Sequence, residues 1–163
     1  MLAADAPIVE PRMVDMVNGA QRGRPVLILI SGLQGTGKTT LAAAVAASLE
    51  ADQTMLATET LAEGRSAVVE SVMARGLRRE WQSDAAALGA PCIVVECICS
   101  DVALHERRVA ERYESGSSAI TWQRVLDDAR TYQPTQDPDY VADAVEPVER
   151  HVDAVVTLVR RRS

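Results

Sequence analysis

The fold of this chain is decided by the stretch Ser31-Gly32-Leu33-Gln34-Gly35-Thr36-Gly37-Lys38-Thr39-Thr40, which fits the phosphate-binding pattern G-x-x-x-x-G-K-[ST]. Glycines in such a loop let the backbone curl, so that consecutive N–H groups point inward at phosphate oxygens. The pattern places the charge of Lys38 on the β- and γ-phosphates and the hydroxyl of Thr39 on Mg²⁺. The residues expected to bind nucleotide phosphate are therefore Gly32, Leu33, Gln34, Gly35, Thr36, Gly37, Lys38, Thr39 and Thr40.

The flanks of this loop distinguish it from an ordinary glycine-rich turn. The apolar run Pro25-Val26-Leu27-Ile28-Leu29-Ile30 precedes it and predicts a strand over about 25–31 that is buried on both faces. Leu41, Val45 and Leu49 follow at helical spacing and predict a helix over about 37–50. A strand, a glycine loop and a helix in this order form the context that the motif requires.

Composition narrows the class of protein further. The chain has 163 residues, of which 47% are apolar, and this predicts one globular domain over 25–163 with a leader over 1–24 packed on it. A net charge of −6 disfavours nucleic-acid partners, and Arg160-Arg161-Arg162 is expected to be a solvated tail. No membrane span or signal peptide is recognisable, and the cysteines Cys92, Cys97 and Cys99 do not form a disulfide framework, so we expect a cytoplasmic protein with reduced thiols.

The rest of the chain alternates between apolar runs and helical patterns. Asp101 and Thr121 are expected to cap helices, Gly64 is expected to end one, and no internal repeat is seen. The predicted helices cover about 52–62, 76–88, 101–114 and 122–132, the further strands cover 66–70, 92–98 and 153–159, and 133–150 is expected to be mostly loop. The result is an α/β fold: a parallel sheet of four predicted strands between layers of helices.

Two acidic residues lie on predicted strands. Glu70 ends its strand, where a carboxylate in a phosphate-loop protein holds Mg²⁺ or orients an attacking group. The alternatives for Glu70 are a cap on the next segment or an ion pair with a nearby arginine, the candidates being Arg75, Arg78 and Arg79. Glu96 lies inside its strand, and we expect it to be structurally paired because a buried charge needs a partner.

The helix over 101–114 carries arginines that share one face. Arg108 and Arg112 are four residues apart, and arginines brought in by a mobile helix stabilise the charge that develops in phosphoryl transfer. We therefore list both as catalytic candidates, with Lys38 and Glu70. The alternative is a solvated face, because Glu106, Glu111 and Glu114 are interleaved as ion-pair partners. The two histidines, His105 and His151, are expected at the surface.

These motifs together resemble the small P-loop kinases of the AAA_33, zeta-toxin-like and gluconate-kinase-like group. The resemblance rests on residues 29–41, 62–70, 95–112 and 131–134. It implies a three-layer P-loop NTPase fold with a small helical lid over about 105–132, and transfer of the ATP γ-phosphoryl group to a hydroxyl of a sugar, nucleoside or antibiotic-like acceptor. It also implies that Lys38 and Thr39 hold ATP and Mg²⁺, that Glu70 is the acid beside the loop, and that Arg108 and Arg112 are the lid arginines.

The chain departs from this family in one place. Such kinases carry a strand that ends in an acid, commonly the base for the acceptor hydroxyl, before the segment that matches 53–63. Here the predicted helix ends near Glu50 and the next begins almost at once; Asp52 lies near the gap but does not match the motif. The acceptor site is then built differently, a piece is missing, or the module binds ATP without transferring phosphate. Motifs of guanine-reading GTPases and of transporter ATPases are not found, and the charge lowers the case for a polynucleotide kinase.

Overall fold

A computed structural model describes residues 24–72 and 75–162, so the predicted leader lies outside the described residues except for Arg24. Five parallel strands form one sheet in the order β2-β3-β1-β4-β5. The strands are β1 (Leu27–Gly32), β2 (Asp52–Gln53), β3 (Ala67–Ser71), β4 (Cys92–Ile98) and β5 (Tyr140–Asp143). The helices are α2 (Lys38–Leu49), α3 (Ala57–Ala62), α4 (Arg75–Ala87), α5 (Val102–Glu114), α6 (Trp122–Thr131) and α7 (Val148–Arg162).

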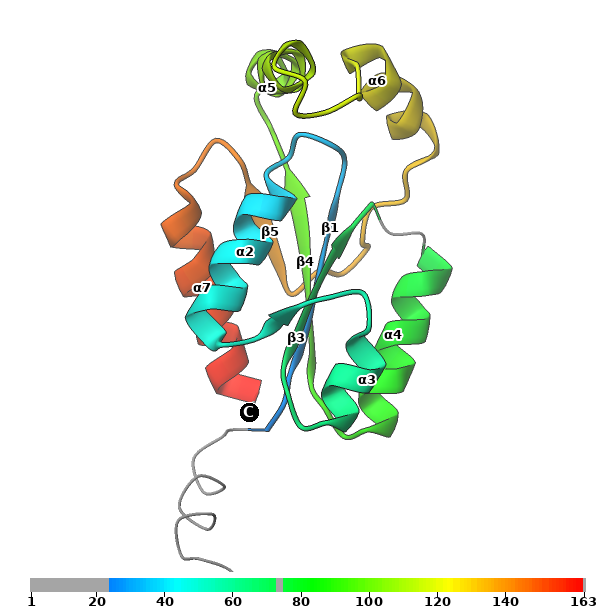
Figure 1. The fold of residues 1–163 in the computed structure, drawn as a ribbon, viewed down its shortest axis with the longest axis vertical. Coiled ribbons are helices and arrows are strands. Elements are labelled where there is room, and N and C mark those ends of the chain that lie inside the picture. Colours follow the sequence, from blue (N-terminus) through cyan, green and yellow to red (C-terminus); the bar gives the residue numbers. More distant parts are fainter. Residues whose placement is uncertain (1–23, 73–74, 163) are drawn as a thin grey trace, which may run out of the picture.

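The sheet lies between two helical layers, as Figure 1 shows. On one face α2 and α7 pack over even-numbered residues of β1 such as Ile28 and Ile30. On the other face α3 and α4 pack over Leu27 and Leu29, with Trp81 of α4 in the same core cluster. Side chains alternate along β1 between these two cores, which explains why Leu27, Ile28, Leu29 and Ile30 are all apolar and buried.

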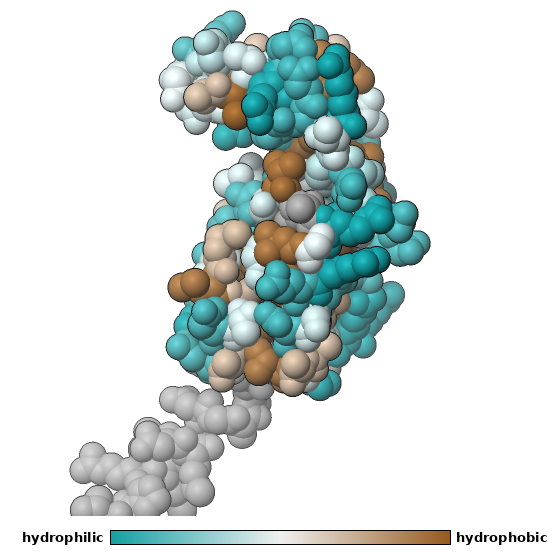
Figure 2. All heavy atoms as spheres, turned by 90° about the vertical axis from the view of Figure 1, so that its right-hand side faces the viewer, coloured by the Kyte–Doolittle hydropathy of each residue, from teal (hydrophilic) through white to brown (hydrophobic). Residues whose placement is uncertain are grey.

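Helices α5 and α6 stand beyond the carboxyl ends of the strands, at the top of Figure 1. Figure 2 shows that this part overhangs the body of the molecule and that its visible face is mainly hydrophilic. The caps of both helices are those expected from the sequence: Asp101 accepts a hydrogen bond from the Leu104 amide, and Thr121 accepts one from the Arg124 amide. Among the described residues, no helix is long and apolar enough to cross a membrane.

The C-terminal part of the prediction was wrong. Residues 153–159 belong to helix α7, and the fifth strand, β5, lies within the segment expected to be loop. Val148, Val152, Val155 and Val159 recur at helical spacing and face the α2 side of the sheet, so packing overrides their β-branched preference for strands. The predicted tail is the last turn of α7, where Arg162 donates to the Cys92 carbonyl.

The segment after α2 also differs from the prediction. Instead of a helix over 52–62, Asp52 and Gln53 form the short strand β2, which pairs with Ala67 and Val68 of β3, and α3 begins only at Ala57. Gly64 follows the end of α3 with a φ of +75°, as its predicted role requires. The segment after α2 therefore adds a two-residue strand to the sheet, which has five strands rather than the four predicted.

Candidate active site

The phosphate loop connects β1 to α2 and is closely packed against its neighbours. A Cβ atom at Gly32 would lie 2.3 Å from the carbonyl oxygen of Cys97, so only glycine fits between β1 and β4. At Gly35, where φ is +82°, a Cβ would lie 2.7 Å from Val109 and 3.0 Å from His105. Helix α5 therefore rests directly on the loop.

Lys38 is buried at the base of the loop and turns back into it. Its Nζ donates a hydrogen bond of 2.8 Å to the carbonyl oxygen of Leu33, which also accepts the hydroxyl of Thr36 at 2.8 Å. Burial lowers the pKa of Lys38, and the carboxylate of Glu70 partly opposes this effect. A phosphate oxygen beside Nζ would compensate the buried charge better than one carbonyl does.

Glu70 lies beside the loop, on the strand next to β1. It pairs in register with Ile30, and its Oε1 accepts a hydrogen bond of 3.0 Å from the hydroxyl of Thr39. Within the described part of the chain, its side chain pairs with none of the arginines considered in the sequence analysis. These two side-chain oxygen atoms are of the kind that Mg²⁺ prefers, and an ion held by them would keep most of its coordination for water and phosphate.

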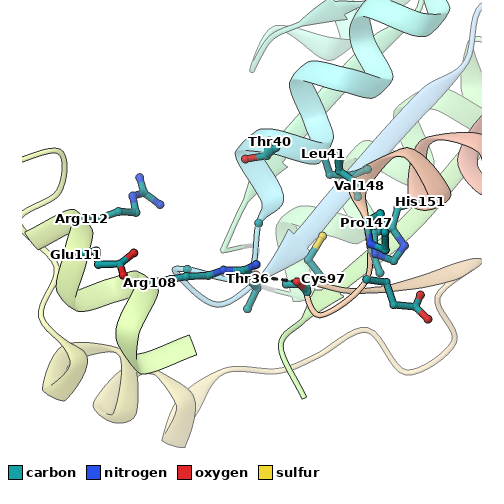
Figure 3. A pocket seen from close by; sticks show the side chains of 15 residues that line it. Thr36, Thr40, Leu41, Cys97, Arg108, Glu111, Arg112, Pro147, Val148 and His151 are labelled. Atoms are coloured by element: carbon teal, nitrogen blue, oxygen red, sulfur yellow. Dashed lines mark hydrogen bonds between the residues drawn. The ribbon is translucent and has the colours of Figure 1, made fainter. Parts of the chain in front are cut away.

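A cavity of about 490 Å³ opens between the loop, α5 and the β5–α7 connection (Figure 3). In Figure 3, Arg108, Glu111 and Arg112 reach in from α5, and Pro147, Val148 and His151 form the opposite wall. The volume is typical of a nucleotide-sized pocket. The lining residues are Gly35, Thr36, Gly37, Thr40, Leu41, Cys97, Arg108, Glu111, Arg112, Ala142, Ala144, Glu146, Pro147, Val148 and His151.

The two candidate arginines have different surroundings. The guanidinium of Arg108 donates to the carbonyl oxygen of Ala144 at 3.1 Å, which connects α5 to the segment after β5. The guanidinium of Arg112 has no hydrogen-bond or ion-pair partner among residues 24–72 and 75–162, and its charge helps to lower the pKa of Lys38. Arg112 is thus the candidate whose charge is available to a ligand at the loop.

A second cavity of about 230 Å³ also borders the loop. It is lined by Gln34, Gly35, Gly37, Lys38, Thr39, Thr40, Arg112, Ser118 and Ile120. Four of these residues also line the larger cavity: Gly35, Gly37, Thr40 and Arg112. The two cavities therefore meet at the phosphate loop, where Arg112 lines both of them and Lys38 lines the smaller one.

Glu96 is structurally paired, as expected, in a buried polar cluster at the ends of β1 and β4. Its carboxylate accepts hydrogen bonds from Ser31 at 2.7 Å and Tyr132 at 2.5 Å, and from the amide and hydroxyl of Thr135 at 3.2 and 2.9 Å. Arg78 approaches the same carboxylate at 3.9 Å and donates to Gln133 O and the Thr135 hydroxyl. We call these residues the Glu96 cluster; it fastens the chain leaving α6 to the sheet.

Both histidines are buried, so the expectation of surface positions was wrong. His105 packs edge-on against Trp122 and donates from Nε2 to the carbonyl oxygen of Gln34 at 2.6 Å. His151 hydrogen-bonds Tyr140 through Nδ1 and Asp143 O through Nε2. Their partners are distant in sequence, and the charged residues around them suggested exposure; the helical spacing of His105 with Val109 was the available signal.

Asp52 lies at the wrong end of its strand to act on an acceptor. It pairs in register with Ala67, the first residue of β3, whereas Glu70 is the fourth, and its carboxylate forms an ion pair with Arg65. The position that follows β2 is Thr54, whose amide donates to the carbonyl of Val68.

The three cysteines are free thiols, and burial raises the pKa of Cys97 to about 12, so this cavity-lining thiol is unreactive at neutral pH.

Comparisons with known proteins agree with this geometry. The family model described as ATPase family associated with various cellular activities matches residues 28–96. The APS kinase of Mycobacterium tuberculosis, in complex with AMPPNP and APS, superposes with a TM-score of 0.62 at 16% identity, covering 85% of this chain and 99% of that one. A gluconokinase from Sinorhizobium meliloti gives 0.59 at 15% identity, covering 86% and 94%.

A sugar kinase from Janibacter gives a TM-score of 0.58 at 14% identity, covering 82% of this chain and 93% of that chain. The search of curated protein sequences gives no match. Identities this low establish the fold and not the substrate. The chain has the P-loop NTPase fold, in the form that it shares with the small P-loop kinases.

Proposed function

We propose that this protein is an ATP-dependent phosphotransferase that moves the γ-phosphoryl group of ATP to a hydroxyl of a small molecule, such as a sugar, a nucleoside or an antibiotic-like acceptor. The observation that carries the proposal is the meeting of two cavities at one phosphate loop. The larger has room for a nucleotide, and Lys38 lines the smaller. A transferred phosphoryl group would lie at their junction.

Each side chain at the junction has a role in this proposal. Lys38 compensates the charge of the β- and γ-phosphates once it leaves the Leu33 carbonyl. Arg112 lines both cavities and stabilises charge that grows on the phosphoryl oxygens during transfer. Arg108, held by the Ala144 carbonyl, contributes to the wall of the nucleotide cavity. Because Arg112 has no other partner for its guanidinium in the described part of the chain, it loses no internal ion pair when it acts.

Mg²⁺ would be held by the hydroxyl of Thr39 and, directly or through water, by the carboxylate of Glu70. When bound, the ion supplies charge neutralisation at the β- and γ-phosphate oxygens. The 3.0 Å hydrogen bond between Thr39 and Glu70 supports this assignment, because it brings the two oxygen donors together before any ligand binds. We retain the remaining loop residues as phosphate ligands through their backbone amides.

We also propose that the segment over about 105–132, which contains most of α5 and all of α6, closes over the bound nucleotide as a lid of the domain over 25–163. Its position beyond the carboxyl ends of the strands supports this (Figure 1). The expected partner is a small molecule in the cytoplasm rather than a nucleic acid or a membrane. The net charge of −6 disfavours the nucleic acid, which is itself negatively charged.

A second candidate is a regulatory module that binds ATP without transferring phosphate. The two-residue strand β2, with no carboxylate after it and with Asp52 paired to Arg65, favours this candidate. The kinase and the regulatory module would both bind nucleotide, but the regulatory module would not turn it over. The two candidates therefore differ in one measurable quantity, the rate of ADP release in the presence of acceptors.

The test combines binding and turnover. ATP, ADP and GTP are titrated with Mg²⁺ into the wild type and Lys38→Ala by calorimetry, and ADP release is then screened over sugars, nucleosides and aminoglycosides. The kinase predicts adenine-nucleotide binding that requires Lys38 and release that one acceptor class stimulates. Binding of ATP without any stimulated release would instead support the regulatory module.

A further inference from the structure

Gln34 of the phosphate loop is fixed by two helices that lie outside the loop. Its carbonyl oxygen accepts a 2.6 Å hydrogen bond from His105 of α5, and its side-chain nitrogen donates a 2.9 Å hydrogen bond to Oδ2 of Asp128 on α6. Backbone and side chain are thus held independently. A residue positioned in this way is preorganised for contact with a ligand.

Asp128 decides which way the amide of Gln34 faces. Its other oxygen, Oδ1, forms an ion pair with the guanidinium of Arg124 at 2.9 Å, and a carboxylate in an ion pair only accepts hydrogen bonds. It can therefore bind the amide nitrogen of Gln34 but not the amide oxygen. The oxygen is turned the other way, is buried, and has no hydrogen-bond partner in the part of the chain that the structure describes.

This unpartnered oxygen belongs to a residue that lines the smaller cavity, together with Lys38, Thr39 and Arg112. A buried acceptor without a donor is unfavourable, and a ligand hydroxyl would satisfy it. We propose that the side-chain oxygen of Gln34 accepts a hydrogen bond from the attacking hydroxyl of the acceptor, and that Asp128 is the positioning residue that aims it. The inference rests on the proposed kinase function and names the residue that orients its acceptor.

The step balances without a protein base. The acceptor oxygen forms a bond to the γ-phosphorus, the bond from that phosphorus to the β–γ bridging oxygen breaks, and ADP leaves with the electron pair. The hydroxyl proton, held by Gln34 until then, passes to an oxygen of the transferred phosphoryl group and from there to water. Phosphoryl transfer depends mainly on positioning and electrostatics. An orienting amide therefore compensates for the missing carboxylate after β2.

The experiment uses the full chain with Mg²⁺ and ATP as the probe, with water alone and with each acceptor of the screen above. Gln34→Leu keeps the volume of the side chain but removes both polar groups. Asp128→Asn can present a donor to Gln34 and so no longer fixes the amide, whereas Asp128→Glu keeps a carboxylate. Asp127→Asn is the matched control, because Asp127 is the neighbouring aspartate on α6 and pairs with Arg130 instead. Binding of AMPPNP is measured for each variant.

We expect Gln34→Leu to lower kcat for transfer at least about tenfold, with AMPPNP affinity within about threefold of the wild type. Asp128→Asn should lose part of the rate, Asp128→Glu should recover most of it, and Asp127→Asn should match the wild type. Transfer by Gln34→Leu at the wild-type rate would overturn the inference alone, as would equal losses of rate and of AMPPNP affinity. A wild type that binds AMPPNP but releases no ADP would overturn the kinase function and this inference together.

Discussion

Replacing Arg78 with methionine should destabilise the fold by removing the cation from the Glu96 cluster. Both side chains are almost fully buried, at 5% exposure each, and their closest approach is 3.9 Å. Breaking a buried pair by removing one partner costs about 3–5 kcal/mol. Here we expect about 3 kcal/mol, the lower end of that range, because Ser31, Tyr132 and Thr135 continue to donate to the carboxylate that is left.

The assay is urea unfolding of Arg78→Met followed by circular dichroism, with Arg79→Met as the matched control. Arg79 is the next residue on α4 and is exposed, so its replacement should change the unfolding free energy by less than about 0.5 kcal/mol. A loss of about 3 kcal/mol corresponds to a Tm lowered by roughly 6–12 °C in a domain of this size. A loss for Arg78→Met below about 1 kcal/mol, or one equal to that of Arg79→Met, would refute the buried cluster as the fastening of α6.

Three further predictions concern the site. Since burial lowers the pKa of Lys38, the charged side chain destabilises the fold most at pH values below that pKa. Lys38→Met should therefore have a Tm at or above that of the wild type at pH 7, and the difference should shrink as the pH rises toward 10. The same variant should no longer bind ATP. Because burial raises the pKa of Cys97 to about 12, Cys97 should resist iodoacetamide at pH 8 while Cys99 reacts first. Mass spectrometry of the native protein measures this, and equal rates of alkylation at Cys97 and Cys99 would contradict the burial of Cys97. Arg112→Ala should lower kcat by about 10²–10³-fold, whereas Arg107→Ala, on an exposed side chain of the same helix, should leave kcat unchanged.

The loop and its flanking elements were predictable because they depend on local sequence. Glycines with positive φ, an apolar run over residues 26–30 and a helical stripe all lie within residues 26–49, and the structure has all three. Strand β4 was predicted with the bounds that it has, and Asp101 and Thr121 cap the helices as expected. Each of these features is decided by a few neighbouring residues.

The errors in the predicted secondary structure arose where tertiary contacts determine whether a segment is a helix, a strand or a loop. The valines of α7 favour a strand on propensity alone, but the α2 side of the sheet needs a helical cover there. Pro138 and Pro147 suggested one long loop, whereas they lie before β5 and before α7, positions that tolerate proline. Strand β2 has only two residues, which is too short for any periodicity to reveal.

In the candidate site, too, features set by local sequence were predictable and features set by distant contacts were not. The position of Glu70 at the end of a strand beside the loop brought it to within hydrogen-bond distance of Thr39, as position alone suggested. By contrast, Gln34 and Asp128 are 94 residues apart, and His105 and Gln34 are 71 apart. The sequence gives no reason to connect these residues unless the positions of α5 and α6 in space are known.

The central claim is that this phosphate loop binds ATP for transfer, and Lys38 gives the most direct test because it is the only lysine in the chain. The measurement is ADP release from Mg²⁺ and ATP by the wild type and Lys38→Met, with calorimetric titration of ADP into both. We predict binding and acceptor-stimulated release for the wild type and neither for Lys38→Met. Release by Lys38→Met at the wild-type rate, or a wild type that binds no adenine nucleotide, would contradict the account.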